Sequence, residues 1–394
     1  MKKLQNIYKS KYIIIGAGIG GLSLALALQK LNKKVLIFEK APEIKEVGAG
    51  VMLTPNATRS LDYLGVLKEI EKEATLPKRT VVRHYKTGEE MSTTDLGNGF
   101  TKRYGHPYYD VHRVNIHSSL YNSVKRNDPD CIKVNHELID FDQSENVVTA
   151  KFKNNLVAEG DFLIGCDGIH SLVRKIIKAS DNPHYTGNLA WRGLMPIESL
   201  PFHQRGPEIT IWIGPKKHVV EYTVKSGKVK NYVAISNVKD WHEEGWTVRS
   251  SVHQALTEFN DWHEDVRNII SATPKNECYK WGLFDRNPLS SWSENRVTIL
   301  GDAAHPMLPF MAQGAAMSIE DAVVLSRCFL QYEYPKEIFE SYEAERIERT
   351  AWCQLQSREA GQLFQKISSR EDLDSDRAQR GRILYEYDAP RVKV

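Results

Sequence analysis

Three glycines near the start of the chain constrain its fold more than any other feature. Gly16, Gly18 and Gly21 form a G-x-G-x-x-G pattern between the β-branched run Tyr12–Ile15, which predicts a buried strand, and Leu22–Leu31, which predicts a helix. In such a unit the first glycine makes a tight turn, the second leaves room for a phosphate, and the third lets helix and strand pack closely. The pattern therefore predicts a dinucleotide held at a helix N-terminus.

A second strand is predicted at Val35–Glu39. Glu39 would end this strand, where a carboxylate can accept hydrogen bonds from the hydroxyls of an adenosine ribose. Strand, turn, helix and strand together are the first half of a doubly wound parallel sheet. The glycine pattern alone does not separate FAD from NAD.

Further along, the chain changes character and then returns to the first pattern. From about Tyr185, short β-branched and aromatic runs separated by Gly, Pro and Lys predict antiparallel strands. We therefore predict an α/β fold with a split Rossmann-like domain, an inserted and mainly antiparallel β domain, and C-terminal helices. The nucleotide domain is assigned to residues 1–75, 100–184 and 282–394, and the β domain to 76–99 and 185–281. The later strands are expected at Thr210–Ile213, His218–Val224, Asn231–Ile235 and Val297–Leu300, and the helices at Glu320–Gln331 and Ile338–Leu363.

Charge and cysteine usage exclude several classes of protein. The 394 residues include 53 Lys and Arg against 50 Asp and Glu, so nothing calls for nucleic acid or an anionic membrane as partner. Five scattered cysteines with no C-x-x-C pair argue against a disulfide framework or a structural metal site, and favour a cytoplasmic protein. Lysines precede the first apolar run as in a signal peptide, but the glycines interrupt that run too early.

The segment Gly301–Gly314, GDAAHPMLPFMAQG, lies between a predicted strand and a predicted helix. It resembles the second FAD-binding motif of the single-component flavoprotein aromatic hydroxylases, the p-hydroxybenzoate hydroxylase-like family. The resemblance implies that Asp302 holds a hydroxyl of the ribityl chain of FAD. It also places the helix start at Gly314 and Ala315 against the flavin ring, where N–H groups and the helix dipole favour its pyrimidine oxygens.

Two other segments carry the same resemblance. Residues 165–174, GCDGIHSLVR, look like the D-G motif of the family, which implies that Asp167 serves FAD and the nicotinamide cofactor; the alternative is an ordinary turn. Residues 110–113, DVHR, resemble its H-R segment, which makes Arg113 a flavin-side cation rather than part of a surface ion pair. Asn115 departs from the Asp often found there. The resemblance adds Lys40, Gly50 and Val51 as cofactor contacts.

The resemblance covers the chain from Tyr12 to Asp388 and is greatest to salicylate hydroxylase-like enzymes and 6-hydroxynicotinate 3-monooxygenases. It implies hydroxylation of a small aromatic acid: NADH or NADPH reduces FAD, the reduced flavin traps O2 as a flavin hydroperoxide, and the distal oxygen atom is delivered to the ring. No second G-x-G-x-x-G motif exists for a separate nicotinamide domain, which fits transient binding of that cofactor.

Aromatic hydroxylation is helped by a base that removes the proton of a ring hydroxyl. His218 is the candidate, because His218, Val220 and Tyr222 share one face of a predicted strand and an imidazole titrates near neutrality. Salicylate hydroxylase-like enzymes have a similar H-x-V-x-Y run, although Thr223 here replaces a frequent Pro. The alternative is ordinary sheet packing. His305 more simply shapes the Asp302 turn. Pro309, Phe310 and Gln313 are expected to line the substrate cavity.

Two other functions stay open at this stage. One is oxygenation of a larger natural product by the same cofactor, for example an epoxidation. The other is a catalytically silent flavoprotein whose FAD serves structure or redox sensing. The ring substrate, the site of hydroxylation and the choice between NADH and NADPH are left undecided, as is the oligomeric state, for which a homodimer is one option.

Overall fold

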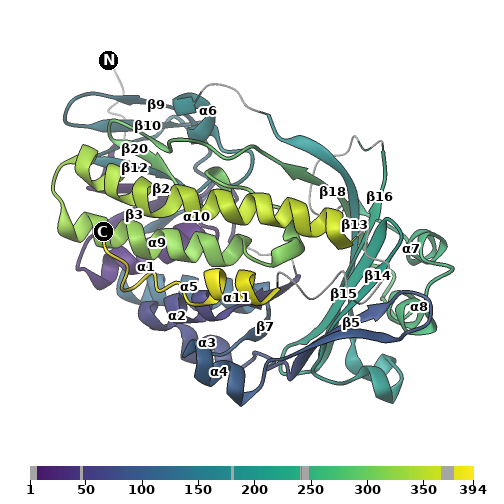
Figure 1. Cartoon of the computed structure of the whole chain (residues 1–394). Helices are drawn as coiled ribbons and strands as arrows, with labels where there is room; N and C mark the ends of the chain where they lie inside the picture. Colours follow the sequence, from purple (N-terminus) through teal and green to yellow (C-terminus); the bar gives the residue numbers. More distant parts are fainter. Residues whose placement is uncertain (1–6, 45–47, 179–181, 240, 242–247, 365–376) are drawn as a thin grey trace.

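The computed structural model describes residues 7–44, 48–178, 182–239, 241, 248–364 and 377–394. A six-stranded sheet lies at the centre of the half that contains the glycine turn (Figure 1). Strands β20, β12, β2, β3 and β8 pair in parallel in that order, and β19 adds an antiparallel edge. These strands are β2 (Tyr12–Ile15), β3 (Val35–Phe38), β8 (Ile132–Lys133), β12 (Phe162–Gly165), β19 (Ser293–Glu294) and β20 (Val297–Ile299).

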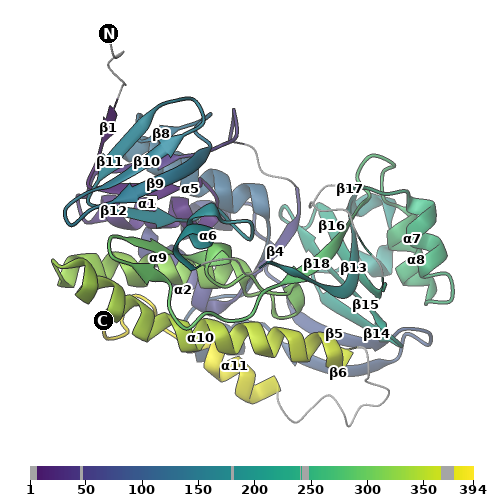
Figure 2. The ribbon, with the colours of Figure 1, turned by 90° about the horizontal axis from the view of Figure 1, so that it is seen from above.

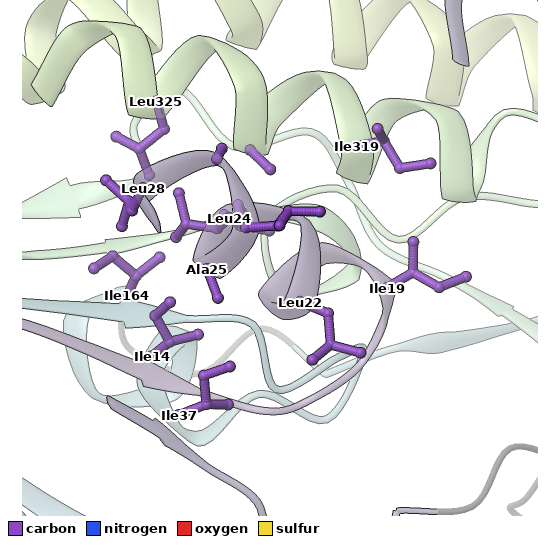
Figure 3. Packing of buried hydrophobic residues seen from close by; sticks show 14 of the residues in the cluster. Ile14, Ile19, Leu22, Leu24, Ala25, Leu28, Ile37, Ile164, Ile319 and Leu325 are labelled. Carbon is purple, nitrogen blue, oxygen red and sulfur yellow. The ribbon is translucent and has the colours of Figure 1, made fainter. Parts of the chain in front are cut away.

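Helix α1 packs between this sheet and helix α9 (Figure 3). Ile14, Ile37 and Ile164 of the sheet lie below α1 in this view, and Ile319 and Leu325 of α9 lie above it. Burying one such side chain stabilises the fold by about 1.5–3 kcal/mol. The apolar sequence of α1 is therefore explained by contact on both sides. The helices are α1 (Ile19–Lys30), α2 (Pro55–Leu64), α3 (Leu67–Glu71), α4 (Asn98–Tyr104), α5 (Arg113–Asn127), α6 (Leu172–Lys178), α7 (Val252–Glu258), α8 (Glu264–Ser271), α9 (Gly314–Gln331), α10 (Pro335–Phe364) and α11 (Arg377–Tyr385).

An eight-stranded sheet forms the other half of the molecule, in the order β17-β18-β13-β16-β15-β14-β5-β6. All neighbours are antiparallel except β14 and β5. Helices α7 and α8 cover its outer face (Figure 2). The inner face of this sheet is directed toward the nucleotide half. The strands are β5 (Arg79–His84), β6 (Glu90–Asp95), β13 (His184–Pro196), β14 (Ile209–Gly214), β15 (Lys217–Val224), β16 (Val229–Asn237), β17 (Val248–Arg249) and β18 (Tyr279–Asp285).

Two smaller sheets complete the structure. A four-stranded sheet, in the order β1-β11-β10-β9, packs on the nucleotide half, where the rings of Phe38 and Phe152 stack with centroids 4.5 Å apart. A two-stranded ribbon, β4 with β7, joins the two halves through contacts between β7 and β15. Within the described residues, no helix is long and apolar enough to cross a membrane. The strands are β1 (Ile7–Lys9), β4 (Gly50–Leu53), β7 (Tyr109–His112), β9 (Leu138–Gln143), β10 (Val148–Phe152) and β11 (Val157–Gly160).

The predicted fold class is confirmed. Strands from both ends of the chain form a parallel sheet, and the segment between them forms a mainly antiparallel sheet. Element boundaries differ by a few residues. Helix α1 begins at Ile19 rather than Leu22, because the second half of the glycine turn is already helical. Strand β18 ends at Asp285, so the large sheet extends beyond residue 281. The domain boundaries themselves stay a prediction.

Candidate active site

A cavity of about 970 Å³ lies between the two halves of the molecule. It extends from the glycine turn, past the carboxyl ends of β2 and β20, to the inner face of the eight-stranded sheet. Ligands of open α/β sheets bind at this edge, outside the carboxyl ends of the strands. Eleven of the residues predicted for the site line it: Gly18, Gly50, Val51, Arg113, His218, Tyr222, Asp302, Pro309, Phe310, Gly314 and Ala315.

The glycine turn meets the cavity at Gly18. A Cβ on Gly16, whose φ is +103°, would lie 2.4 Å from the carbonyl oxygen of Cys166, and one on Gly21 would lie 2.1 Å from that of Gly16. A Cβ on Gly18 would have no described atom within 4 Å. Gly16 and Gly21 are thus required by packing, whereas Gly18 keeps open space at the N-terminus of α1. Free backbone N–H groups at such a helix end suit a pyrophosphate.

Glu39 and Lys40 do not line this cavity. The Glu39 carboxylate accepts hydrogen bonds from the N–H of Ala17 and from that of Ala41, both at 2.9 Å. It therefore ties the glycine turn to the end of β3. Each carboxylate oxygen has capacity for another hydrogen bond, so contact with a ribose stays a prediction. The Lys40 side chain is exposed.

Asp302 follows β20 and points into the cavity, where its carboxylate is exposed to the hollow although protein surrounds the site. The surrounding protein keeps bulk water from Asp302 and thereby raises its pKa, and the nearby His305 and Arg113 lower it in part. Gly314 and Ala315, the first residues of α9, line the same region. A carboxylate, a cation and a helix N-terminus converge here, and this donor and acceptor set fits the sugar alcohol and ring oxygens of a flavin.

Asp167 does not reach the cavity, although Gly168 of the same motif does. One carboxylate oxygen of Asp167 accepts from the N–H of Leu172 at 2.8 Å and of Val173 at 3.2 Å, and the other accepts from the Ser171 hydroxyl. Burial raises the pKa of Asp167, and these hydrogen bonds oppose that shift. In this structure Asp167 stabilises the start of α6, and its contact with a cofactor remains a prediction.

Gln313 was expected to line the substrate cavity; it is not among the residues that line the cavity here, and its contact with a substrate stays a prediction. Its side chain is buried: Oε1 accepts from Asn56 Nδ2 at 3.1 Å, and Nε2 donates to Thr54 Oγ1 at 3.1 Å. Gln313 precedes α9 in a helical backbone conformation, and its side chain enters this buried polar cluster. Pro309 and Phe310 do line the cavity.

His218, Val220 and Tyr222 lie together on the cavity face of β15, as the alternation predicts. His218 is 1% exposed, and its ring centroid lies 5.2 Å from that of Phe310. Burial lowers the pKa of His218 to about 3, so its imidazole is neutral near pH 7. Burial raises the pKa of Tyr222, which keeps the phenol protonated. His305 lies outside the lining; its Nε2 contacts Asp321 at 2.5 Å.

The sequence analysis missed many polar residues of the cavity wall, among them Arg192 and Asn231. Arg192 on β13 is buried, its guanidinium lies 5.1 Å from the Tyr279 ring and 5.4 Å from the Trp281 ring, and burial lowers its pKa. Asn231 on β16 is also buried. A signal for Asn231 was present, because it shares one face of a predicted strand with Val233 and Ile235.

Comparison with known proteins agrees with this geometry. Residues 9–355 match the family described as FAD binding domain. The chain is 34% identical to 3-hydroxybenzoate 6-hydroxylase 1 of Aquipseudomonas alcaligenes, covering 89% of each chain. It is 33% identical to 6-hydroxynicotinate 3-monooxygenase of Bordetella bronchiseptica, covering 88% of this chain and 90% of that one. A salicylate hydroxylase substrate complex has a similar structure, with a TM-score of 0.80, 25% identity and coverage of 97% of this chain and 96% of the other.

The chain belongs to the FAD binding domain family. It is a flavoprotein monooxygenase that binds FAD and uses NAD(P)H, in agreement with the sequence prediction. The site described above fits this cofactor, because the open space at Gly18, the carboxylate of Asp302 and the start of α9 line one continuous cavity.

Proposed function

We propose that this monooxygenase hydroxylates a small aromatic acid similar to a hydroxybenzoate, salicylate or 6-hydroxynicotinate. The observation that carries the proposal is the cavity wall, where apolar side chains surround a neutral imidazole and a few buried donors. Ligand sites of this kind use apolar surface for affinity and few polar groups for orientation. The substrates named for the two curated relatives support the same class.

The residues of the wall have distinct tasks in this proposal. Ile211, Val220 and Val233 exclude water and contact the ring faces. An imidazole nitrogen of the neutral His218 accepts a hydrogen bond from the hydroxyl of the substrate. This hydrogen bond increases the electron density of the aromatic ring of the substrate. With a pKa of about 3, His218 is a weak base, so it polarises the hydroxyl more than it removes its proton. Tyr222, whose phenol stays protonated, donates a hydrogen bond to the aromatic substrate.

FAD, when bound, supplies the electrons taken from NAD(P)H and transfers one oxygen atom of O2 to the ring. In our proposal the N–H groups at Gly18 bind its pyrophosphate, and Asp302 accepts from its ribityl chain. The N–H groups at Gly314 and Ala315 face its ring oxygens, and Arg113 adds a positive charge.

The test is substrate-stimulated oxidation of NADH and NADPH by the holoenzyme across hydroxybenzoates, aminohydroxybenzoates and hydroxynicotinates, with products identified by mass spectrometry. We expect at least one acid to stimulate cofactor oxidation and to gain a single oxygen atom. Stimulation only by larger aromatic compounds would contradict the proposed substrate class. Bound FAD with negligible turnover across all compounds would instead favour a non-catalytic flavoprotein.

We also propose a cytoplasmic location. All five cysteines are free, four of them are buried, and none is paired in a disulfide within the described part of the chain. Free thiols persist most readily in a reducing compartment. Cell fractionation with an antibody to the protein would check this location.

A further inference from the structure

The side chain of Asn231 has a defined orientation in the cavity wall. It is 1% exposed, and its Oδ1 accepts a hydrogen bond from the N–H of Gly50 at 2.9 Å. Only the amide oxygen can accept from an N–H, so this contact fixes which end of the amide is nitrogen. Among the described residues, Nδ2 of Asn231 has no hydrogen-bond partner. Two N–H donors are therefore buried at the cavity with no protein acceptor.

Close packing against β4 holds this amide in place. A Cβ on Gly50 would lie 2.7 Å from Cγ of Asn231 and 2.5 Å from Cε2 of Tyr222. The two side chains are cross-strand neighbours, because Tyr222 of β15 and Asn231 of β16 are paired in register. The backbone of Gly50 therefore packs closely against both Asn231 and Tyr222. A donor fixed in this way loses little conformational freedom when it binds a ligand.

The surroundings of Asn231 favour an anionic acceptor. Val233, the next residue of β16 on the same face, pairs in register with Arg192 of β13, so a buried guanidinium lines the cavity one strand away. A buried N–H without an acceptor is unfavourable, and a hydrogen bond to an ionised group is about twice as strong as a neutral one. His218 lies at the far end of the same wall, paired with Ile235.

We propose that Asn231 is a specificity-determining residue whose Nδ2 donates a hydrogen bond to the carboxylate of the aromatic acid. The proposal rests on the proposed function and deepens it, because it also sets the orientation of the ring. The carboxylate lies toward Asn231 and Arg192, and the ring hydroxyl points toward His218. Tyr222 is the fourth residue after His218 along β15, a span of about 13 Å between Cα atoms, which leaves room for one ring between the side chains.

The test measures binding rather than turnover. 3-Hydroxybenzoate and 3-hydroxybenzamide are titrated into the holoenzyme at pH 8, and the change in flavin absorbance gives the two dissociation constants. We expect the wild type to bind 3-hydroxybenzoate on the order of 10- to 100-fold more tightly than 3-hydroxybenzamide, as a charged hydrogen bond implies. Asn231→Asp keeps an acceptor for Gly50 but replaces the donor with a negative charge. It should remove that preference, while FAD occupancy after purification stays at the wild-type level.

Asn231→Leu, which removes the amide without adding charge, is the second variant and should reduce the preference to the part that Arg192 supplies. Val233→Ala is the matched control, since it alters the same strand without polar groups and should weaken both ligands equally. A wild type that does not distinguish the acid from the amide would overturn the inference. This outcome is independent of the substrate-stimulated cofactor oxidation that tests the proposed function. Loss of FAD with an unchanged preference would overturn it too, because Nδ2 would then serve the flavin.

Discussion

The buried histidine of the cavity wall has a measurable thermodynamic consequence. Burial lowers the pKa of His218 to about 3 in the folded protein, against about 6.5 in the unfolded chain. The unfolded state therefore binds the proton first, so the contribution of His218 to stability is present above pH 6.5 and is lost as pH falls toward 3. Linkage gives a loss of about 2 kcal/mol at pH 5 and only about 0.2 kcal/mol at pH 7.

Replacing His218 with Asn removes this titration. The free energy of unfolding, measured by urea denaturation of the holoenzyme with excess FAD at pH 7 and pH 5, should fall by about 2 kcal/mol less in His218→Asn than in the wild type. His112, whose pKa burial lowers to about 4, adds a parallel pH dependence to both proteins and cancels in the difference.

Val220→Ala serves as the control, because it opens space in the same wall without a titrating group. It should lower stability equally at both pH values. Equal pH dependence in His218→Asn and the wild type would refute the reasoning, since His218 would then not be a buried, neutral imidazole.

Three further predictions follow from the described contacts. Gly18→Ala should fold normally but lower FAD occupancy, because the added methyl group enters open space at the helix N-terminus. Gly21→Ala should lower the melting temperature, because the added methyl group strikes the carbonyl oxygen of Gly16. Absorbance at 450 nm measures the first effect and thermal denaturation the second. Arg346→Met should lower the free energy of unfolding by about 3 kcal/mol, because it removes one cation from the buried carboxylates of Glu320 and Asp321, which keep only Arg349 and His305. Lys336→Met at an exposed ion pair should change it by less than about 0.5 kcal/mol in urea denaturation. Asp302→Ala should reduce FAD retention during gel filtration, and full retention would contradict its assigned contact.

Local sequence chemistry predicted the nucleotide half well. Gly16 and Gly21 follow from backbone geometry, because each faces a carbonyl oxygen that a side chain would strike. The apolar strand Tyr12–Ile15 needed no tertiary information either, since a run buried on both faces is typical of a parallel sheet. Asp302 could be placed because the motif that contains it joins a strand to a helix.

The rest of the site depends on contacts that the sequence does not encode locally. Asn231 became a site residue because β16 meets β4, and this depends on the packing of two distant segments. Gln313 lies one residue before Gly314, which lines the cavity, yet its side chain contacts Asn56 and Thr54 in a buried polar cluster. The backbone conformation at the start of α9 sets this direction, and neither periodicity nor composition gives it.

The order of the chain implies that cofactor binding depends on the whole molecule. Gly18 follows β2, and Asp302 follows β20; these two strands flank β12 in the sheet although the inserted sheet and more than two hundred residues separate them in sequence. Six of the eight strands of the inserted sheet lie between β12 and β20 in the chain, so the fold of that segment returns the chain to the position beside β12 that β20 occupies. A flavin that contacts both ends of the cavity thus binds only the fully assembled structure, and its binding free energy stabilises both halves together.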